Sequence, residues 1–300
     1  MHLTLRQIKV FEAVARHRSF TRAAAELYLT QPAVSMQIKQ LEETTGLPLF
    51  EQLGKRVYLT EAGKEFARYS RAITQQLNEA AQVLDELKGL QRGRLQISVA
   101  TTGAYIAPYL LSAFARSFPG IMVNMTVTNR QVLLEQLENN EVDMAIMGQP
   151  PEDVPLEAVP FLENLLVVAA PPGHPLVGKG TIPLKALENE PFIIREEGSG
   201  TRSAAERFFA SAGVKINAIM EMSSHEAIKH AVRAGLGLGI VSTHTIRLEL
   251  EGGYLAILDV ESLPIRRHWY LVHRRGKRLA GAALAFNDYL LGQDVPRLLP

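Results

Sequence analysis

Residues 60–90 contain no proline, and their two glycines, Gly63 and Gly89, stand near the ends of the stretch. The spacing of apolar residues predicts one long helix over residues 61–90, roughly 40 Å at 1.5 Å per residue, with a coiled-coil seam that contains one stutter. The seam residues recur at steps of three and four: Ala62, Phe66, Tyr69, Ile73, Leu77, Ala80, Leu84 and Leu87. Such a helix divides the chain into a head, residues 1–60, and a body, residues 91–300.

A coiled-coil seam needs a partner helix. We expect a second copy of the chain, because a dimer would hold two heads at a fixed separation. The alternative is a helix that packs along its own body. Residues 91–94, Gln-Arg-Gly-Arg, are expected to end the helix and act as a hinge.

The head shows the spacing of three short helices followed by a hairpin. Helices are expected over residues 4–16, 19–28 and 31–45, and strands on either side of residues 51–56 predict a wing. The boundaries rest on residues that favour helix ends: Thr4 with Gln7, Ser19, Thr30, Pro32 and Gly46. Two helices joined by a short turn form a helix-turn-helix, here at about residues 20–39.

If the apolar stripe of the third helix faces inward, its other side presents Gln31, Pro32, Ser35, Met36 and Lys39. Gln can bind adenine through two hydrogen bonds, Ser can bind several bases and Met can contact a thymine methyl group. Lys39, with Lys55 and Arg56 of the hairpin, is assigned to phosphates, which give affinity without sequence information. The alternative is a three-helix packing unit with an ordinary polar surface.

Charge is distributed in a way that is compatible with a DNA-binding head. Residues 1–60 carry eight Lys and Arg against five Asp and Glu, whereas the whole chain has a net charge of only +1. The chain has no cysteine, which excludes disulfides and thiolate metal sites. Its first residues turn polar at once, and no apolar run reaches the ~18 residues of a membrane span. We therefore expect a cytoplasmic protein without a membrane segment.

Strand-like and helical runs alternate through the body, which predicts an α/β domain with parallel strands. Strands are expected at residues 95–100, 122–128, 142–147, 165–169, 192–194, 216–222, 240–241 and 269–273. Helices are expected near residues 104–117, 131–139, 202–212, 226–234 and 280–291. The last strand and helix should return to the first lobe, so that lobe I comprises residues 91–162 and 266–300, and lobe II comprises residues 163–265.

Ligands in open parallel sheets bind at the carboxyl ends of strands. In both lobes these ends are small, polar and partly cationic, which favours an anionic small molecule between the lobes. The candidate residues are Thr101, Thr102, Gly103, Arg130, Gln149, Arg195, Ser199, Gly200, Thr201, Arg202 and His225. The alternative for each of the hydroxyl-bearing turns is a cap that satisfies only its own helix.

Several other patterns predict no enzyme activity. The glycines of residues 235–239 precede a strand and lack the spacing of a dinucleotide-binding loop. Ser199 has no nucleophile-elbow context, and the eight scattered His residues predict no metal site. His225 and His230 are expected on a helix surface. A solute-binding protein has the same body architecture, but the polar N-terminus and the head argue against it. A nucleotide-dependent enzyme is also disfavoured, because the sequence has neither a correctly placed dinucleotide-binding fingerprint nor a catalytic pair.

The head closely resembles LysR-type transcriptional regulators. The resemblance rests on residues 19–27, 30–35, 41–42, 46, 49–50 and 59–63, which match the family motifs in order and spacing. It implies a winged helix-turn-helix, a linker helix and a two-lobed, periplasmic-binding-protein-like effector domain. It also implies a homodimer or tetramer that controls a nearby promoter together with RNA polymerase. The residues that would contact bases are Gln31, Pro32, Ser35 and position 36, and Arg56 would make a contact from the wing. The chain departs from many members at Met36 and Gln52, where they have arginine.

Within that family, three segments resemble the CbbR type, whose members activate carbon-fixation (RuBisCO) operons. The segments are residues 31–42, 49–56 and 195–202. The resemblance implies no cofactor, but an effector such as ribulose bisphosphate, phosphoenolpyruvate or NADPH. The alternative is a LysR-type regulator of another metabolic operon with a carboxylate effector.

Overall fold

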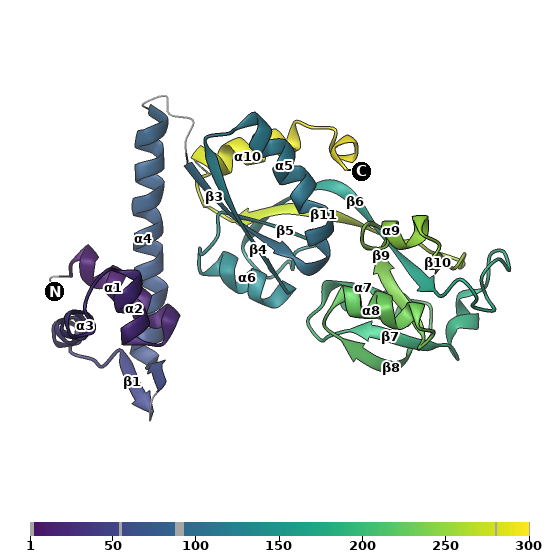
Figure 1. Cartoon of the computed structure of the whole chain (residues 1–300), viewed down its shortest axis with the longest axis horizontal. Helices are drawn as coiled ribbons and strands as arrows, with labels where there is room; N and C mark the ends of the chain where they lie inside the picture. The colour runs from purple at the N-terminus through teal and green to yellow at the C-terminus, as the bar shows by residue number, and fades with distance from the viewer. Residues whose placement is uncertain (1–2, 54–55, 88–92, 280, 300) are drawn as a thin grey trace. The chain divides into compact units, whose positions relative to one another are not determined.

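The computed structural model describes residues 3–53, 56–87, 93–279 and 281–299 (Figure 1). The chain divides into two compact units, residues 1–88 with 139–141 and residues 89–138 with 142–300. The first contains a winged helix-turn-helix and a long helix, and the second is an α/β domain of two lobes. The expected fold class is therefore confirmed. None of the described helices is long and apolar enough to cross a membrane.

Three helices and a hairpin form the head, as the sequence predicts. They are α1 (Leu5–His17), α2 (Phe20–Glu26), α3 (Gln31–Thr45), β1 (Phe50–Leu53) and β2 (Arg56–Leu59). The Thr4 and Gln7 capping box is present, and Gly46 ends α3 with a left-handed φ of 72°. The prediction that α2 reaches Tyr28 is wrong. Tyr28 has φ of 53° and turns the backbone toward α3, so the helix ends two residues earlier.

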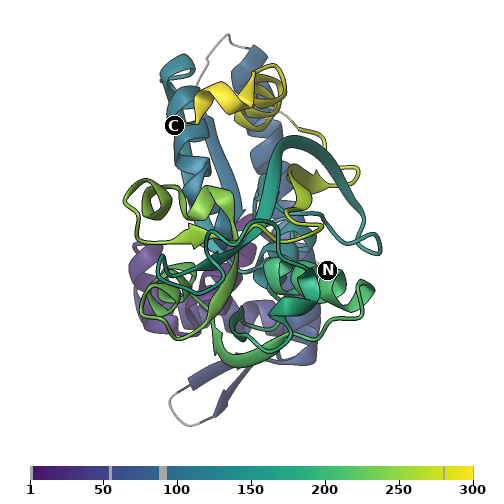
Figure 2. The same ribbon diagram turned by 90° about the vertical axis from the view of Figure 1, so that its right-hand side faces the viewer.

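Helix packing in the head explains why its apolar residues recur as they do. Phe11 of α1 lies at the centre, with its ring 5.0 Å from that of Phe50 and 4.8 Å from that of Phe66. Ala23 and Ala24 are buried where α2 meets the other helices, and their small side chains let those helices approach closely. Glu42 accepts hydrogen bonds from two backbone amides at the start of the hairpin, which fixes the wing against α3. Figure 2 shows the hairpin projecting from the helices of the head.

The long helix α4 (Glu61–Leu87) begins in the core of the head. Ala62 and Phe66 pack against that core, so the prediction that they belong to a seam for a partner helix is wrong. Further along, Tyr69, Ile73 and Leu77 are 58%, 42% and 44% exposed. The side chains of Leu84 and Leu87 lie outside the described residues. Tyr69, Ile73 and Leu77 therefore present a row of apolar side chains to solvent.

A nine-stranded sheet runs through both lobes of the second unit in the order β4-β3-β5-β11-β6-β9-β7-β8, with β10 paired to β6. The strands are β3 (Gly93–Ala100), β4 (Ile121–Thr128), β5 (Met144–Met147), β6 (Leu156–Ala170), β7 (Pro191–Arg195), β8 (Asn217–Met222), β9 (Leu238–Ser242), β10 (Ala256–Ile257) and β11 (Ile265–Arg274). Lobe I has β3 parallel to both β4 and β5, and lobe II has β7 parallel to both β8 and β9.

The helices of this unit cover both lobes (Figure 1). They are η1 (Thr101–Tyr105), α5 (Ala107–Ser117), α6 (Arg130–Glu138), η2 (Leu184–Leu187), α7 (Gly200–Ser211), α8 (His225–Arg233), η3 (Thr243–Thr245), α9 (Arg247–Glu251), α10 (Gly281–Leu291) and η4 (Val295–Leu298). The single helix expected near residues 104–117 is two elements. Its α-helical part starts only at Ala107, because Pro108 lacks an amide hydrogen and suits a first turn.

Two antiparallel strands, β6 and β11, connect the lobes. Their register runs from Ile265 opposite Leu166 to Arg274 opposite Leu156, with a bulge between Trp269 and Tyr270. The expected return of the chain to lobe I is present, since α10 contributes Phe286 and Leu290 to the core beneath β3. The carboxyl ends of β3, β5 and β7 consequently meet between the lobes.

Candidate functional site

The exposed face of α3 carries the residues that the sequence assigns to DNA bases. Gln31, Pro32, Met36 and Lys39 are exposed, and Ser35 is half-buried. Gln31 Nε2 donates a hydrogen bond of 2.8 Å to Ser35 Oγ, so the two side chains form one polar unit on the first turns of the helix. The opposite face is buried in the core of the head. The N-terminal half of α3 is therefore free to approach base edges in a major groove.

A basic hollow of about 470 Å³ lies beside the wing, and of its basic residues only Arg56 was predicted to bind DNA. It is lined by Arg18, Ser19 and Arg22 near the start of α2 and by Arg56 and Tyr58 of β2. The described residues contain no ion pair to Arg18, Arg22 or Arg56, whereas Glu26 pairs with Arg16 and His17. Lys55 lies outside the described residues. Besides Arg56, the position of Arg22 in the first turn of the predicted second helix was a sequence signal for this surface.

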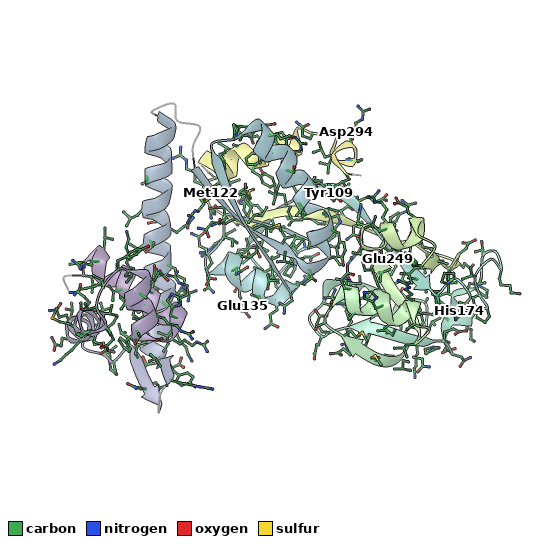
Figure 3. All side chains as sticks on the ribbon, in the orientation of Figure 1. Tyr109, Met122, Glu135, His174, Glu249 and Asp294 are labelled. Carbon is green, nitrogen blue, oxygen red and sulfur yellow. The ribbon has the colours of Figure 1, made fainter. Side chains whose placement is uncertain are left out.

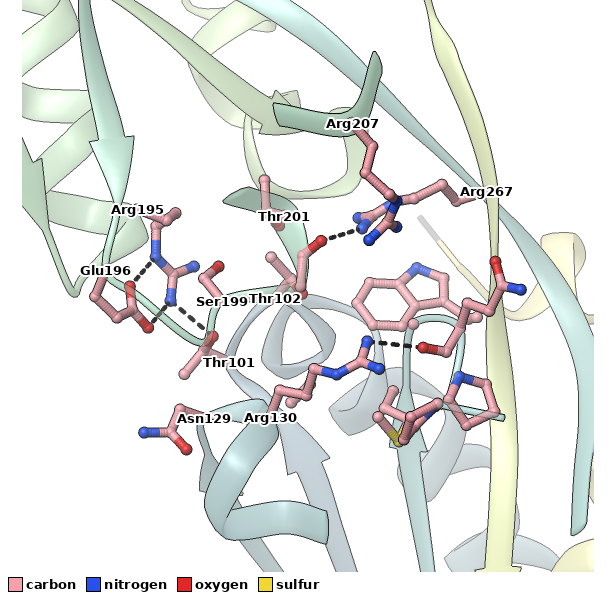
Figure 4. Close-up of a pocket in the computed structure, with 18 of the residues that line it drawn as sticks. Thr101, Thr102, Asn129, Arg130, Arg195, Glu196, Ser199, Thr201, Arg207 and Arg267 are labelled. Atoms are coloured by element: carbon pink, nitrogen blue, oxygen red, sulfur yellow. Dashed lines mark hydrogen bonds and ion pairs between the residues drawn. The ribbon is translucent and has the colours of Figure 1, made fainter. Parts of the chain in front are cut away.

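A second hollow, a cavity of about 290 Å³, opens between the two lobes of the body (Figure 4). Its lining includes eight of the eleven predicted effector residues: Thr101, Thr102, Arg130, Gln149, Arg195, Ser199, Gly200 and Thr201. They come from the ends of β3, β5 and β7 and from the starts of η1, α6 and α7. The sheet topology brings these residues together because parallel strands end at the same edge.

Three predicted effector residues do not line the cavity. Gly103 is buried, and an added Cβ would lie 2.7 Å from a methyl group of Val99, so this glycine lets η1 pack on β3. Arg202 forms ion pairs with Glu206 and Glu221 instead. His225 is 4% exposed, so the prediction that it lies on a helix surface is wrong. It is the first residue of α8 and contacts Arg195 at the end of β7.

Sequence reasoning missed several residues of the lining, among them Asn129, Glu152, Glu196, Arg207, Arg267 and Trp269. Arg267 and Trp269 are two residues apart on β11 and therefore share a face of the sheet. That alternation was a usable signal for the pair. Arg207 lies two turns into α7, on the same side of the helix as Gly200, and only the helical period could have indicated it.

Three guanidinium groups, those of Arg130, Arg207 and Arg267, are directed into the same part of the cavity (Figure 4). Arg130 Nη1 donates to the backbone oxygen of Gln149 at 2.8 Å, and Arg267 Nη1 donates to that of Gly200 at 2.9 Å. Burial and the neighbouring arginines lower the pKa of Arg267 to about 10, and burial and Arg207 lower that of Arg130. We call these three residues the arginine cluster.

Buried donors accompany the arginine cluster. Among the described residues, Arg267 Nε and the indole Nε1 of Trp269 are buried without a hydrogen-bond partner. A buried donor without an acceptor is unfavourable, and mutually repelling cations add to that cost. An anion with several acceptor oxygens would satisfy both, and guanidinium groups match the geometry of phosphate and carboxylate.

Arg195 has a different role from the arginine cluster, although it also borders the cavity. Its Nε and Nη2 donate to the two carboxylate oxygens of Glu196 at 2.6 and 2.7 Å. Nη2 also donates to Thr101 Oγ1 at 3.2 Å, and Nη1 donates to the ring Nε2 of His225. The positive charge of Arg195 is thus already compensated, and this side chain mainly joins the walls of the cavity.

The buried His225 predicts a pH dependence of stability. Burial and the charge of Arg195 lower the pKa of His225 from 6.5 to about 3. Between these values the unfolded chain binds a proton that the folded chain excludes, so stability falls as the pH decreases below 6.5. At pH 5 the loss of folding free energy due to this group is about 2 kcal/mol.

His225→Gln, which keeps an acceptor for Arg195, should reduce the fall in melting temperature between pH 6.5 and pH 5. His230→Gln, on the exposed side of α8, should keep the wild-type profile, and an identical slope in all three proteins would contradict the assignment.

Comparison with known proteins finds a matching family model for each of the two units. Residues 5–64 match the model of the bacterial regulatory helix-turn-helix protein, lysR family, and residues 88–294 match that of the LysR substrate binding domain. The RuBisCO operon transcriptional regulator of Allochromatium vinosum is 56% identical over 98% of this chain and 97% of its own length. The HTH-type transcriptional activator CmpR of Synechocystis sp. is 47% identical over 97% of this chain and 96% of its own.

A solved structure also resembles the second unit. The regulatory domain of CcmR from Synechocystis PCC6803, in complex with 2-PG (2-phosphoglycolate), superimposes with a TM-score of 0.65 and 43% sequence identity. The match covers 67% of this chain and 97% of that one.

Proposed function

The chain belongs to the LysR family of bacterial transcriptional regulators, and from that premise we propose that it activates a carbon-fixation (RuBisCO) operon in response to a small phosphorylated metabolite. As a member of this family it is a DNA-binding regulator and not an enzyme. The similarity to RuBisCO operon regulators over nearly the whole chain supports the choice of operon. The arginine cluster is the observation that supports a phosphorylated effector.

A phosphate dianion fits the cluster better than a lone carboxylate does. Three guanidinium groups and the indole NH supply more donors than the two oxygens of one carboxylate can accept, whereas a phosphate offers three strongly accepting oxygens. The hydroxyls of Thr101, Thr102, Ser199 and Thr201 remain for a second polar group of the effector. The cavity volume of about 290 Å³ lies at the lower limit for small-molecule sites, which favours a metabolite of few carbons over NADPH.

Thermal denaturation of the full chain tests the effector class. 2-Phosphoglycolate, phosphoenolpyruvate and ribulose bisphosphate should raise the melting temperature by several degrees, since a ligand at 100 times its Kd adds about 2.7 kcal/mol. Glycolate, the phosphate-free counterpart of phosphoglycolate, is the matched control and should have little effect. Equal stabilisation by glycolate would support the alternative of a carboxylate effector instead.

The head supports binding to a palindromic operator by a dimer. The exposed row on α4 is the surface that we assign to the second copy, and a tetramer would pair two such dimers. The DNA-binding domain would then comprise residues 1–60, the linker and dimerisation helix residues 61–90, and the effector-binding domain residues 91–300. Effector binding would change the spacing of the heads and thereby the access of RNA polymerase. The protein would work in the cytoplasm, where its DNA lies.

Two substitutions in the head should separate base reading from phosphate binding. Gln31→Ala should weaken operator binding by about 1–3 kcal/mol, or roughly 5- to 150-fold, and should affect random duplex much less. Arg22→Ala should weaken binding to both duplexes equally and should reduce the salt dependence of affinity. Electrophoretic mobility shifts at several salt concentrations measure both. Equal losses on the two duplexes for Gln31→Ala would show that Gln31 does not read bases.

A further inference from the structure

The short helix η1 belongs to lobe I but is held by lobe II at both ends. At its start, Thr101 accepts the hydrogen bond from Arg195 of β7. At its end, the hydroxyl of Tyr105 donates to Glu226 Oε1 of α8 at 2.5 Å. The ammonium group of Lys229 lies 5.1 Å from the centroid of the Tyr105 ring. These contacts join the lobes at the rim of the cavity without any ligand.

Lobe II presents a rigid acceptor to Tyr105. Lys229 is 6% exposed, and its Nζ is 2.7 Å from Glu226 Oε1 and 2.8 Å from Glu249 Oε1. The same atom donates to the backbone oxygen of Thr245 at 3.1 Å, which fixes it between α8, α9 and η3. Figure 3 shows Glu249 within this part of lobe II. Burial and the hydrogen bond to Glu226 raise the pKa of Tyr105, so its phenol stays a neutral donor.

We propose that Tyr105, Glu226 and Lys229 form a clasp that keeps the lobes closed in the absence of effector and thereby sets the affinity of the cavity for any effector. Tyr105 is a positioning residue in this proposal, since it does not line the cavity. The proposal rests on the effector site described under the proposed function. Its test differs from the test of that function because the closure of the lobes can be measured without ligand.

The clasp acts through the population of the closed state. An effector that contacts both lobes binds the closed form, so its apparent Kd is the intrinsic Kd divided by the closed fraction. Loss of one hydrogen bond to a charged carboxylate lowers the closing equilibrium by about tenfold. Every effector should therefore lose the same factor of affinity. Loss of a side chain from the arginine cluster should instead act mainly on phosphorylated effectors.

The single tryptophan of the chain, Trp269, provides an intrinsic probe of closure. It borders the cavity and is 1% exposed, so opening of the lobes should expose its indole to water. Tyr105→Phe keeps the ring beside Lys229 and removes only the hydroxyl. In the full-length protein without ligand, this variant should show stronger quenching of Trp269 fluorescence by acrylamide and a red-shifted emission. Tyr109→Phe, four residues later and 44% exposed, is the matched control and should behave as wild type.

Calorimetric titration with 2-phosphoglycolate and with phosphoenolpyruvate completes the test. Tyr105→Phe should raise both Kd values by the same factor, about two- to fivefold, and saturating ligand should restore the wild-type quenching. Glu226→Ala removes an exposed side chain and should reproduce both effects if Tyr105→Phe does not fold. Wild-type quenching in both variants would overturn the clasp. If wild type binds neither compound, the proposed effector class fails, and the quenching comparison still decides the clasp.

Discussion

Arg207→Gln and Arg267→Gln should each weaken the binding of 2-phosphoglycolate by about 10- to 100-fold, because each removes a guanidinium group that lines the cavity and would face the phosphate. Glycolate, which lacks the phosphate, should lose far less. Isothermal titration of the full chain measures both compounds. The unliganded Arg267→Gln protein should melt no lower than wild type, since burial and the adjacent arginines already disfavour the charge of Arg267.

Arg266→Gln is the matched control for this prediction. Arg266 precedes Arg267 on β11 but points to the other face of the sheet, where it pairs with Glu163 at 2.7 Å and is 70% exposed. Its substitution should leave the affinity for 2-phosphoglycolate unchanged. A loss of affinity as large as that of Arg267→Gln would mean that the overall charge of the domain, and not the arginine cluster, attracts the effector.

Ile73→Lys combined with Leu77→Lys should convert the protein to a monomer and lower its affinity for a palindromic operator by about 10²- to 10⁴-fold. Both side chains stand in the exposed apolar row of α4, where added ammonium groups on two paired helices would repel each other. Sedimentation velocity gives the association state, and mobility shifts give the operator affinity. A single half-site should be bound equally by the variant and wild type.

The opposite face of α4 offers the control for this second prediction. Lys64 is exposed there and pairs only with Glu61 among the described residues. Lys64→Glu changes the charge by a similar amount and should leave the association state unchanged. If the doubly substituted protein sediments as wild type does, the exposed row is not the surface that joins two copies.

Local rules were sufficient for most of the head. The Thr4–Gln7 capping box, the Thr30 cap and Gly46 each fix a helix end through atoms within four residues in sequence. The end of α2 was mispredicted because the left-handed backbone of Tyr28 serves the turn into α3, and nothing in a tyrosine indicates that conformation.

Longer-range pairing limited the prediction of the body. β6 extends from Leu156 to Ala170, whereas only residues 165–169 were expected. Its first half is stabilised by pairing with β11, more than 100 residues later, and several of its side chains there are exposed. An apolar pattern shows a strand only where a face is buried, so the sequence of this half carried little signal.

The candidate site shows the same division. Residues at the carboxyl ends of parallel strands could be predicted, because the topology alone brings them together. Arg207 and Arg267 were missed, since neither stands at the carboxyl end of a strand or at a helix start, and the helix and strand that carry them meet only when the chain returns to lobe I. Arg202 was selected for its place at a helix start, but the helix turns it toward Glu206 and Glu221.

The return of the chain to lobe I has a consequence for how the protein is made. The core of lobe II is drawn from one uninterrupted stretch between Leu166 and Ile265, whereas the core of lobe I also needs Phe286 and Leu290. On the ribosome, lobe II has all of its core residues before lobe I does, although lobe I is begun first. A premature stop codon that removes α10 would therefore leave a complete second-lobe core beside a first lobe whose apolar residues stay accessible to the cell's proteases.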